Sequence, residues 1–131
     1  MVKGRGEVVG DRSEGPGEIR QGEVFWLDFG PATGSAPAER HPCVVVQSDV
    51  FNSSRIATSV VCLITSNLMR ANAPGNVALR KGDANLPKAS VVNVSQLLTV
   101  DKSELGERIG RLPVETVDAI RKGLYLLFDR V

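Results

Sequence analysis

The chain has 131 residues, of which 42% are apolar and 24% are charged, and its formal net charge is +1. This length fits one domain with a single hydrophobic core, and no apolar run approaches the roughly 18 residues that a membrane-spanning helix needs, so we expect a soluble protein. The balanced charge excludes a strongly basic, nucleic-acid-binding composition. Between residues 31 and 90, however, basic residues outnumber acidic ones, which suits a modest phosphate-binding face.

Residues 1–18 are rich in glycine and charge and lack the apolar core of a secretory signal. We predict that they form a disordered leader and that the ordered domain covers residues 19–131. Cys43 and Cys62 lie inside apolar runs, so we expect two free, buried thiols in a reducing cytoplasm rather than a disulfide.

The first predicted strand covers residues 23–29, where aromatic and β-branched residues are enriched before a Gly-Pro pair. Its tryptophan, Trp26, is the only one in the chain, and we place it in the core. The segment ATGSAPAER has too little apolar content to pack, so it is expected to be a mobile loop. Pro42 then fixes the backbone at the mouth of a strand at 43–47.

The remaining sequence alternates short apolar runs with polar turns until residue 113, where the period changes. We predict a single helical turn at 48–54 and strands at 56–65, 76–79, 90–98 and 106–112, the last at a sheet edge. A C-terminal helix is indicated by apolar residues three and four apart, at Val117, Ile120, Leu124, Leu127 and Phe128. The expected fold is therefore mainly β with a C-terminal α-helix: one domain, built as a small half-open barrel that the helix covers.

Several common catalytic motifs are missing from the sequence. One histidine and two cysteines, without CxxC or HExxH spacing, cannot supply a typical zinc site. No GxGxxG loop follows a strand, and the Gly-Ser pair at 34 and 35 is not a GxSxG nucleophile elbow. Any catalysis is therefore expected to use ordinary polar side chains, with no metal and no cofactor.

Five segments then stand in a recognisable order. They are Arg20-Gln21-Gly22-Glu23-Val24-Phe25-Trp26-Leu27-Asp28, Gly34-Ser35, Arg40-His41-Pro42 with its apolar run, Ile64-Thr65, and Ser90 to Gln96. Together they resemble the MazF/PemK family of toxin endoribonucleases, and the resemblance covers about residues 19–130. It implies an SH3-like, PemK- and CcdB-like half-open barrel that works as a homodimer.

The resemblance also implies an activity. Family members are cytoplasmic toxins of type II toxin-antitoxin systems that cut single-stranded RNA at short sequences without a metal, leaving a 2′,3′-cyclic phosphate and a 5′-hydroxyl. The expected substrate is messenger RNA, with transfer or ribosomal RNA as alternatives. The expected protein partner is a cognate antitoxin whose acidic, disordered tail covers the RNA-binding surface, and no membrane is involved.

Three candidate catalytic residues follow from the family pattern. The family's arginine stands immediately before the proline, where this chain has His41, with Arg40 one residue earlier, and the strand-end threonine falls on Thr65. Arginine stays protonated and binds phosphate in a bidentate manner, whereas histidine, with an ordinary pKa of roughly 6.5, moves protons near neutral pH. The hypothesis is that Arg40 stabilises the phosphorane charge, His41 shuttles a proton and Thr65 donates a hydrogen bond to a phosphoryl oxygen. An exchange of roles between Arg40 and His41 is the alternative.

Polar residues of neighbouring segments are candidates for reading splayed bases and binding the RNA backbone. They are Ser35, Asn67, Arg70, Arg80, Lys81, Lys88, Asn93, Ser95 and Gln96. Asn93 and Ser95 stand where some relatives carry an arginine and a carboxylate used in catalysis, so this sequence departs from the usual acid/base pair.

Two other functions remain as alternatives. A non-catalytic toxin of the same fold would bind a protein such as gyrase, but such relatives lack the junction of arginine and proline and use a tryptophan near the C-terminus, where this chain ends LLFDRV. A degenerate homologue would only bind RNA or its antitoxin, in keeping with the missing strand arginine and carboxylate.

Overall fold

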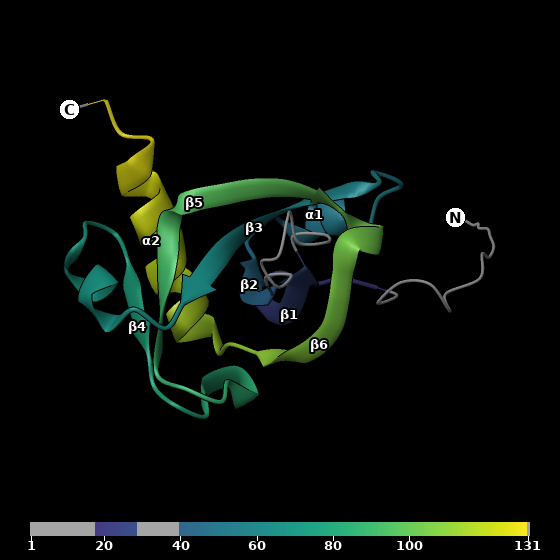
Figure 1. Ribbon diagram of the computed structural model, residues 1–131. Coiled ribbons are helices and arrows are strands. Elements are labelled where there is room, and N and C mark those ends of the chain that lie inside the picture. Colours follow the sequence, from purple (N-terminus) through teal and green to yellow (C-terminus); the bar gives the residue numbers. More distant parts are fainter. Residues whose placement is uncertain (1–17, 29–39, 131) are drawn as a thin grey trace, which may run out of the picture.

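The computed structural model describes residues 18–28 and 40–130 (Figure 1). Its described strands form one six-stranded antiparallel sheet in the order β4-β5-β3-β2-β1-β6. The strands are β1 (Glu23–Asp28), β2 (Arg40–Val45), β3 (Thr58–Thr65), β4 (Val77–Leu79), β5 (Ser90–Asp101) and β6 (Leu105–Arg111). The helical elements are α1 (Asp49–Asn52), η1 (Leu68–Asn72), η2 (Asp83–Asn85), η3 (Lys102–Glu104) and α2 (Val114–Leu127). Within the described residues, no helix is long and apolar enough to cross a membrane.

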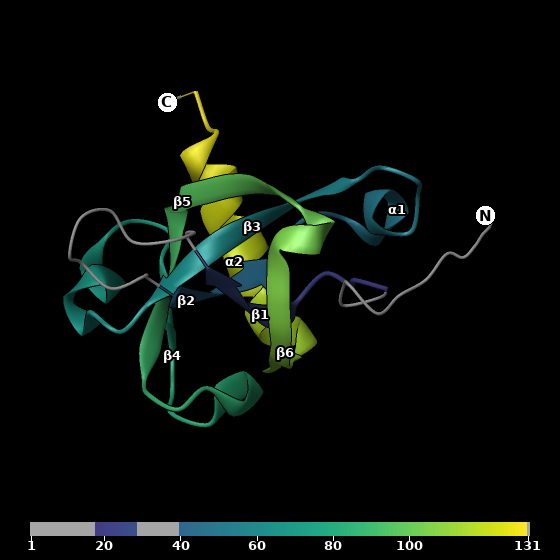
Figure 2. The same ribbon diagram turned by 45° about the vertical axis from the view of Figure 1, so that its right-hand side comes forward.

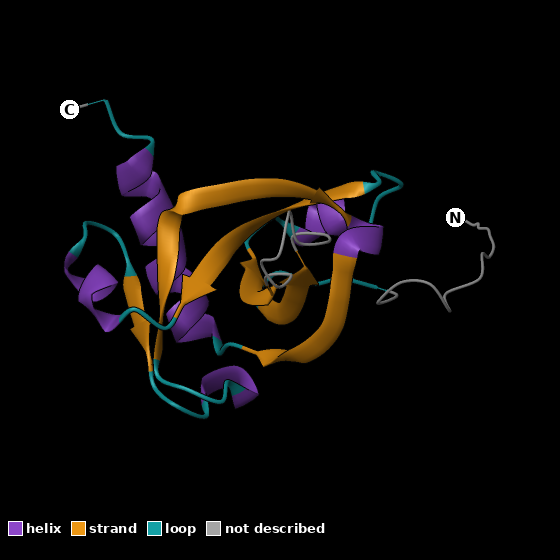
Figure 3. Cartoon of the chain, viewed as in Figure 1, coloured by secondary structure: helices purple, strands orange, loops and turns teal. Residues whose placement is uncertain are grey.

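The sheet is strongly curled, and α2 covers one of its faces (Figures 1 and 2). The long strand β5 bends over the sheet and leads through η3 into β6, which returns along the far edge beside β1 (Figure 3). The predicted mainly β, half-open barrel with one C-terminal helix is therefore confirmed. The predicted leader, apart from Glu18, and the predicted loop before Arg40 lie outside the described residues.

Strand β2 begins earlier than the sequence predicted. Arg40 and Pro42 already pair with β1, opposite Asp28 and Trp26. Proline lacks a backbone donor, and it is tolerated here because pairing between β2 and β3 begins only at Cys43. His41 is consequently held in a strand and not in a loop, so its backbone is anchored on β1.

Both faces of the central strands are buried, which explains their continuous apolar sequences. Val24, Val44 and Ile64 belong to the cluster that α2 covers through Ile120. Phe25 and Leu27 of β1 and Cys43 and Val45 of β2 belong to a second cluster on the other face, which β5 and β6 close through Val100 and Leu105. Because successive strand residues point to opposite faces, one strand contributes to both clusters.

The two cysteines lie within these clusters, as the sequence predicted. Cys43 and Cys62 are both free and buried. Burial in apolar surroundings disfavours the charged thiolate and raises the pKa of each thiol from 9.0 to about 12.

A close contact between α2 and the turn before β4 fixes the position of η1. A Cβ atom on Gly123 of the helix would overlap the carbonyl oxygen of Gly75 in that turn. The next residue, Asn76, accepts a hydrogen bond from the Val94 amide at 2.9 Å and donates one to the Arg70 carbonyl at 2.9 Å. Since Arg70 belongs to η1, this arrangement ties that element to both the helix and the sheet.

Candidate active site

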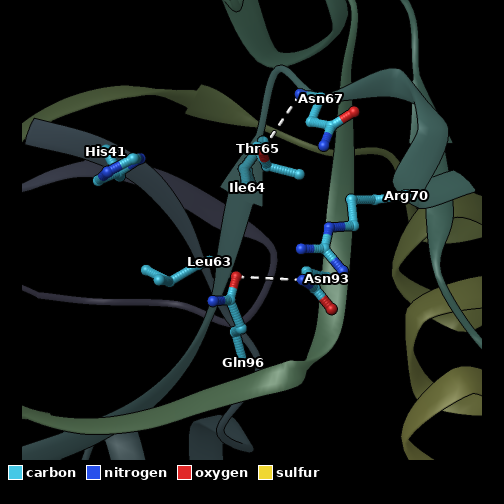
Figure 4. A pocket seen from close by; sticks show the side chains of 8 residues that line it. All are labelled: His41, Leu63, Ile64, Thr65, Asn67, Arg70, Asn93 and Gln96. Carbon is cyan, nitrogen blue, oxygen red and sulfur yellow. Dashed lines mark hydrogen bonds between the residues drawn. The ribbon is translucent and has the colours of Figure 1, made fainter. Parts of the chain in front are cut away.

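A hollow of about 310 Å³ opens at the rim of the sheet, where β2 begins and β3 ends (Figure 4). We call it the His41 hollow. It is lined by His41, Leu63, Ile64, Thr65, Asn67, Arg70, Asn93 and Gln96. Six of these eight lining residues were predicted from the sequence as catalytic or substrate-binding groups, and Leu63 and Ile64 are the two that were not.

Thr65 stands at the last position of β3, and its hydroxyl oxygen accepts a hydrogen bond from the Asn67 amide at 3.1 Å (Figure 4). Asn67 in turn begins η1, because its side-chain oxygen accepts from the Met69 amide at 3.2 Å. An accepting hydroxyl keeps its own proton for donation. Thr65 can therefore donate to a ligand while its oxygen is held in place by the chain.

Arg70 extends from η1 towards Asn93 across the hollow (Figure 4). In the part of the chain that the structure describes, no carboxylate pairs with its guanidinium. The positive charge of this side chain is therefore not neutralised by a described neighbour, which favours binding of an anion such as phosphate.

Asn93 forms the floor of the hollow and is only 6% exposed. Its amide nitrogen donates to Gln96 at 3.1 Å, and its oxygen accepts from Ser95 at 2.9 Å and from Asn76 at 3.4 Å. A register shift causes this arrangement: Cys62 is opposite Leu97 but Leu63 is opposite Asn93, so residues 94–96 bulge out of β5. The bulge turns Gln96 back over the floor, whereas Ser95 bonds to Asn93 and does not line the hollow.

A second hollow, of about 230 Å³, lies next to the first. We call it the Trp26 hollow. It is lined by Trp26, Arg40, His41, Pro42, Ile64, Ser66, Leu86, Pro87, Lys88 and Ser90. The prediction that Trp26 belongs to the core was wrong: its side chain is only partly buried and stands outside both core clusters. Trp26 shares a sheet face with Arg40, which the β1–β2 register determines and the sequence alone did not.

Arg40 lies with its guanidinium 4.4 Å from the centroid of the Trp26 ring, a cation–π contact. Its nitrogens also lie 3.8 Å from an Asp28 oxygen and 4.0 Å from a Glu107 oxygen. Of the two hollows, Arg40 lines only the Trp26 hollow, whereas His41 lines both. The described geometry thus places Thr65 and Arg70 on one side of His41 and Arg40 on the other.

The remaining predicted residues divide between the second hollow and more distant positions. Lys88 lines the Trp26 hollow. Arg80 and Lys81 line neither hollow and belong to the turn after β4, where the Arg80 amide donates to Asp83 at 2.7 Å. Ser35 lies outside the described residues. Within the described ranges, no group of three histidine, cysteine or acidic side chains is arranged to hold a metal ion.

The fold defines a class of small barrel proteins with known members among solved structures. An endoribonuclease from a mycobacterial species, solved with its cognate antitoxin, superposes with a TM-score of 0.67 at 25% identity, over 86% of this chain and 99% of that one. A MazE–MazF complex from Deinococcus radiodurans shares the fold with a TM-score of 0.67 at 24% identity, over 84% of this chain and 95% of that one.

Sequence comparison places the chain within that class. Endoribonuclease MazF6 of Mycobacterium tuberculosis is 42% identical over 111 residues, which are 85% of this chain and 97% of the relative. Endoribonuclease EndoA of Bacillus subtilis is 28% identical over 108 residues, which are 82% of this chain and 92% of the relative. Residues 20–128 match the family described as PemK-like, MazF-like toxin of type II toxin-antitoxin system, and the chain belongs to that family.

Proposed function

We propose that this chain is a metal-independent, sequence-specific endoribonuclease that cleaves single-stranded RNA to 2′,3′-cyclic phosphate and 5′-hydroxyl ends. The observation that carries the proposal is the gathering of an imidazole, a hydroxyl and a guanidinium around the His41 hollow, in a toxin family whose curated relatives are named endoribonucleases. These groups match what the reaction needs: a proton carrier, a hydrogen-bond donor for a phosphoryl oxygen, and positive charge.

In the proposed reaction, His41 accepts the proton of the ribose 2′-hydroxyl while the 2′ oxygen forms a bond to phosphorus. The bond between phosphorus and the 5′ oxygen then breaks, and the imidazole returns the proton to the departing 5′ oxygen. Thr65 donates its hydroxyl proton to a phosphoryl oxygen, because its own oxygen is already engaged with the Asn67 amide. The products are a cyclic phosphate and a free 5′-hydroxyl, and the imidazole ends in its starting state.

Two arginines supply positive charge, one from each side of His41. Arg70 reaches the scissile phosphate across the His41 hollow, and Arg40 reaches it from the Trp26 hollow. Neither side chain is expected to carry a proton between substrate groups, because arginine stays protonated in proteins. This assigns the proton transfer to His41 and charge stabilisation to the two guanidinium groups.

Sequence recognition is proposed to come from carboxamides at the rim, reading bases that are splayed out of a single strand. Asn67 and Gln96 line the hollow directly, with Asn93 and Ser95 holding Gln96 from behind. Backbone phosphates are proposed to bind Lys88 at the neighbouring hollow and Arg80 and Lys81 farther away. Ser35 is proposed as a further contact to the substrate.

The experiment that tests this proposal is incubation of the purified protein with a long single-stranded RNA in EDTA, followed by mapping of the ends. We expect cuts at one fixed short sequence, with 5′ ends that a polynucleotide kinase labels without prior phosphatase treatment. RNA that stays intact but shifts on a native gel would contradict cleavage and favour a homologue that only binds RNA.

The proposed assembly is a cytoplasmic homodimer that a cognate antitoxin inhibits through an acidic, disordered tail. Support for a protein-binding surface comes from large apolar side chains exposed at the end of α2, with Tyr125 79% and Phe128 68% exposed. The related mycobacterial endoribonuclease was solved with its cognate antitoxin. Light scattering should give the mass of a dimer, and a monomer at micromolar concentration would contradict this part of the proposal.

A further inference from the structure

We infer that the Trp26 hollow is a nucleobase subsite: one base of the RNA, next to the phosphate that is cut, stacks there against the paired side chains of Trp26 and Arg40. The inference rests on the proposed function for its substrate class. It adds a second contact region, on the other side of His41 from the carboxamides and Arg70.

The chemistry of the walls favours a base over other ligands. A flat, apolar surface comes from the Trp26 ring with Pro42 and Ile64, while Lys88, Ser66 and Ser90 supply polar groups at the same hollow. Bases in single-stranded RNA bind by stacking on aromatic rings or on the plane of an arginine, with polar groups reaching the base edge or the phosphate. Trp26 and Arg40, 4.4 Å apart, offer both surfaces in one place.

The volume of the hollow is consistent with a single base. Pockets for drug-sized ligands begin at roughly 300 Å³, and this one measures about 230 Å³. It stays open with Arg40 in position over the ring, so the contact between Arg40 and Trp26 does not fill it. The carboxylates of Asp28 and Glu107 lie 3.8 and 4.0 Å from guanidinium nitrogens of Arg40, and neither residue lines the hollow.

The position of the hollow sets which base it receives. His41 and Ile64 line both hollows, so the two cavities meet at the rim of the sheet. Thr65 lines one hollow and the next residue, Ser66, lines the other. An RNA strand that places a phosphate at His41, between Thr65 and Arg40, therefore places the neighbouring nucleotide in the Trp26 hollow.

The first test uses Trp26 as its own reporter. It is the only tryptophan of the chain, so intrinsic tryptophan fluorescence reports on this hollow alone. The full-length protein is titrated with four 2′-O-methylated homo-oligonucleotides, which cannot form a cyclic phosphate, and with an abasic oligomer of the same length and charge. We expect saturable quenching by at least one of the base-containing oligomers and no quenching by the abasic one. Equal quenching by the abasic oligomer, or no quenching by any of the four at millimolar concentration, would overturn the inference.

The second test separates stacking from a structural role. Trp26→Phe keeps an aromatic face and Trp26→Leu removes it, while Phe51→Leu, at an exposed aromatic of α1 that lines neither hollow, serves as the matched control. We expect Trp26→Leu to raise KM for RNA about tenfold with little change in kcat, and Trp26→Phe to raise it less than about threefold. Equal KM for both variants and the wild type, with unchanged thermal unfolding, would overturn the inference.

The results that would contradict the subsite differ from those that would contradict the endoribonuclease activity. A wild-type protein that leaves RNA intact contradicts the endoribonuclease proposal, yet the fluorescence titration still decides whether the hollow takes a base. A wild-type protein that cuts RNA but is not quenched by any base-containing oligomer leaves the activity standing and removes the subsite.

Discussion

The two ends of strand β3 carry polar clusters that look alike in sequence but differ in structure. At the start of β3, Asn52 is 4% exposed, and its side chain makes four hydrogen bonds, to the Gln47 carbonyl and side chain, to Asp49 and to Ser59. An amide can satisfy about four such bonds, so this group has no remaining capacity. We call these residues the Asn52 cluster, and it is closed on itself.

At the end of β3, the comparable buried amide is Asn93, whose side chain makes three hydrogen bonds within the described residues, to Gln96, Ser95 and Asn76. Around it, Arg70 and Thr65 point their polar atoms into an open hollow (Figure 4). Polar residues alone therefore do not mark a functional site in this fold. What distinguishes the His41 hollow is that its charge and donors are directed at space that a ligand can enter.

The substitution His41→Ala is expected to distinguish the functional His41 hollow from the structural Asn52 cluster most clearly. Removing the proposed proton carrier should lower the rate of RNA cleavage by about 10² or more, while the free energy of unfolding changes little. Cleavage kinetics under single-turnover conditions and urea unfolding give the two quantities. Cleavage within about threefold of the wild type would exclude His41 as the group that moves the proton.

Asn52→Ala should have the opposite signature. The substitution leaves the side chains of Gln47 and Ser59 and the Asp49 carboxylate without their buried partner, at a cost of about 3 kcal/mol of unfolding free energy. The matched control is Asn72→Ala at an exposed position of η1, which should change stability by less than about 1 kcal/mol. Below the unfolding temperature, the Asn52 variant should still cut RNA at the wild-type rate. A lost rate in fully folded protein would show that the Asn52 cluster also serves the site.

A smaller effect on the cleavage rate is expected from Arg70, which gives the His41 hollow its positive charge. Arg70→Ala should lower cleavage about tenfold by removing one charged contact to phosphate, whereas Arg55→Ala, an exposed arginine that lines neither hollow, should have no effect. Comparing the two variants at low and high salt tests the assignment, because the loss at Arg70 should shrink as salt screens the contact. Equal rates for both variants would place the phosphate elsewhere.

Much of the fold could be predicted from the sequence because its signals are local. Alternating and continuous apolar runs marked the strands, and the change of period after Pro113 marked α2. The start of β2 could not be predicted, since pairing of Arg40 and Pro42 with β1 is a long-range contact that a proline-containing segment does not announce. Boundaries that depend on a partner strand are therefore the part that sequence patterns miss.

The candidate site was predictable by residue type but not by arrangement. Thr65, Asn67, Arg70, Asn93 and Gln96 were candidates in the sequence, and they line one hollow. The bulge at residues 94–96, which orients Gln96, arises from the register between β3 and β5 and leaves no local signal. Trp26 was placed in the core because its strand is apolar, and only the register that pairs it with Pro42 reveals that it shares an open face with Arg40.

The apolar strands β2 and β3 exclude solvent, and the reactivity of their buried cysteines, Cys43 and Cys62, measures that exclusion. The thiolate is the reactive form, so a pKa raised from 9.0 to about 12 lowers the thiolate fraction at pH 8 by about 1,000-fold, in addition to the steric protection of burial. We expect iodoacetamide to leave Cys43 and Cys62 unmodified in the native protein at pH 8 and to modify both in urea, as read by mass spectrometry.

Because the folded pKa of each thiol lies above the unfolded one, the unfolded chain loses its thiol protons first, so the free energy of unfolding should fall as the pH rises from about 9 towards 12. A Cys43→Val variant reports on Cys62 alone and should lose part of this pH dependence. Rapid native modification would mean that β2 and β3 open together, and a rim that depends on their register would then not be preorganised for catalysis.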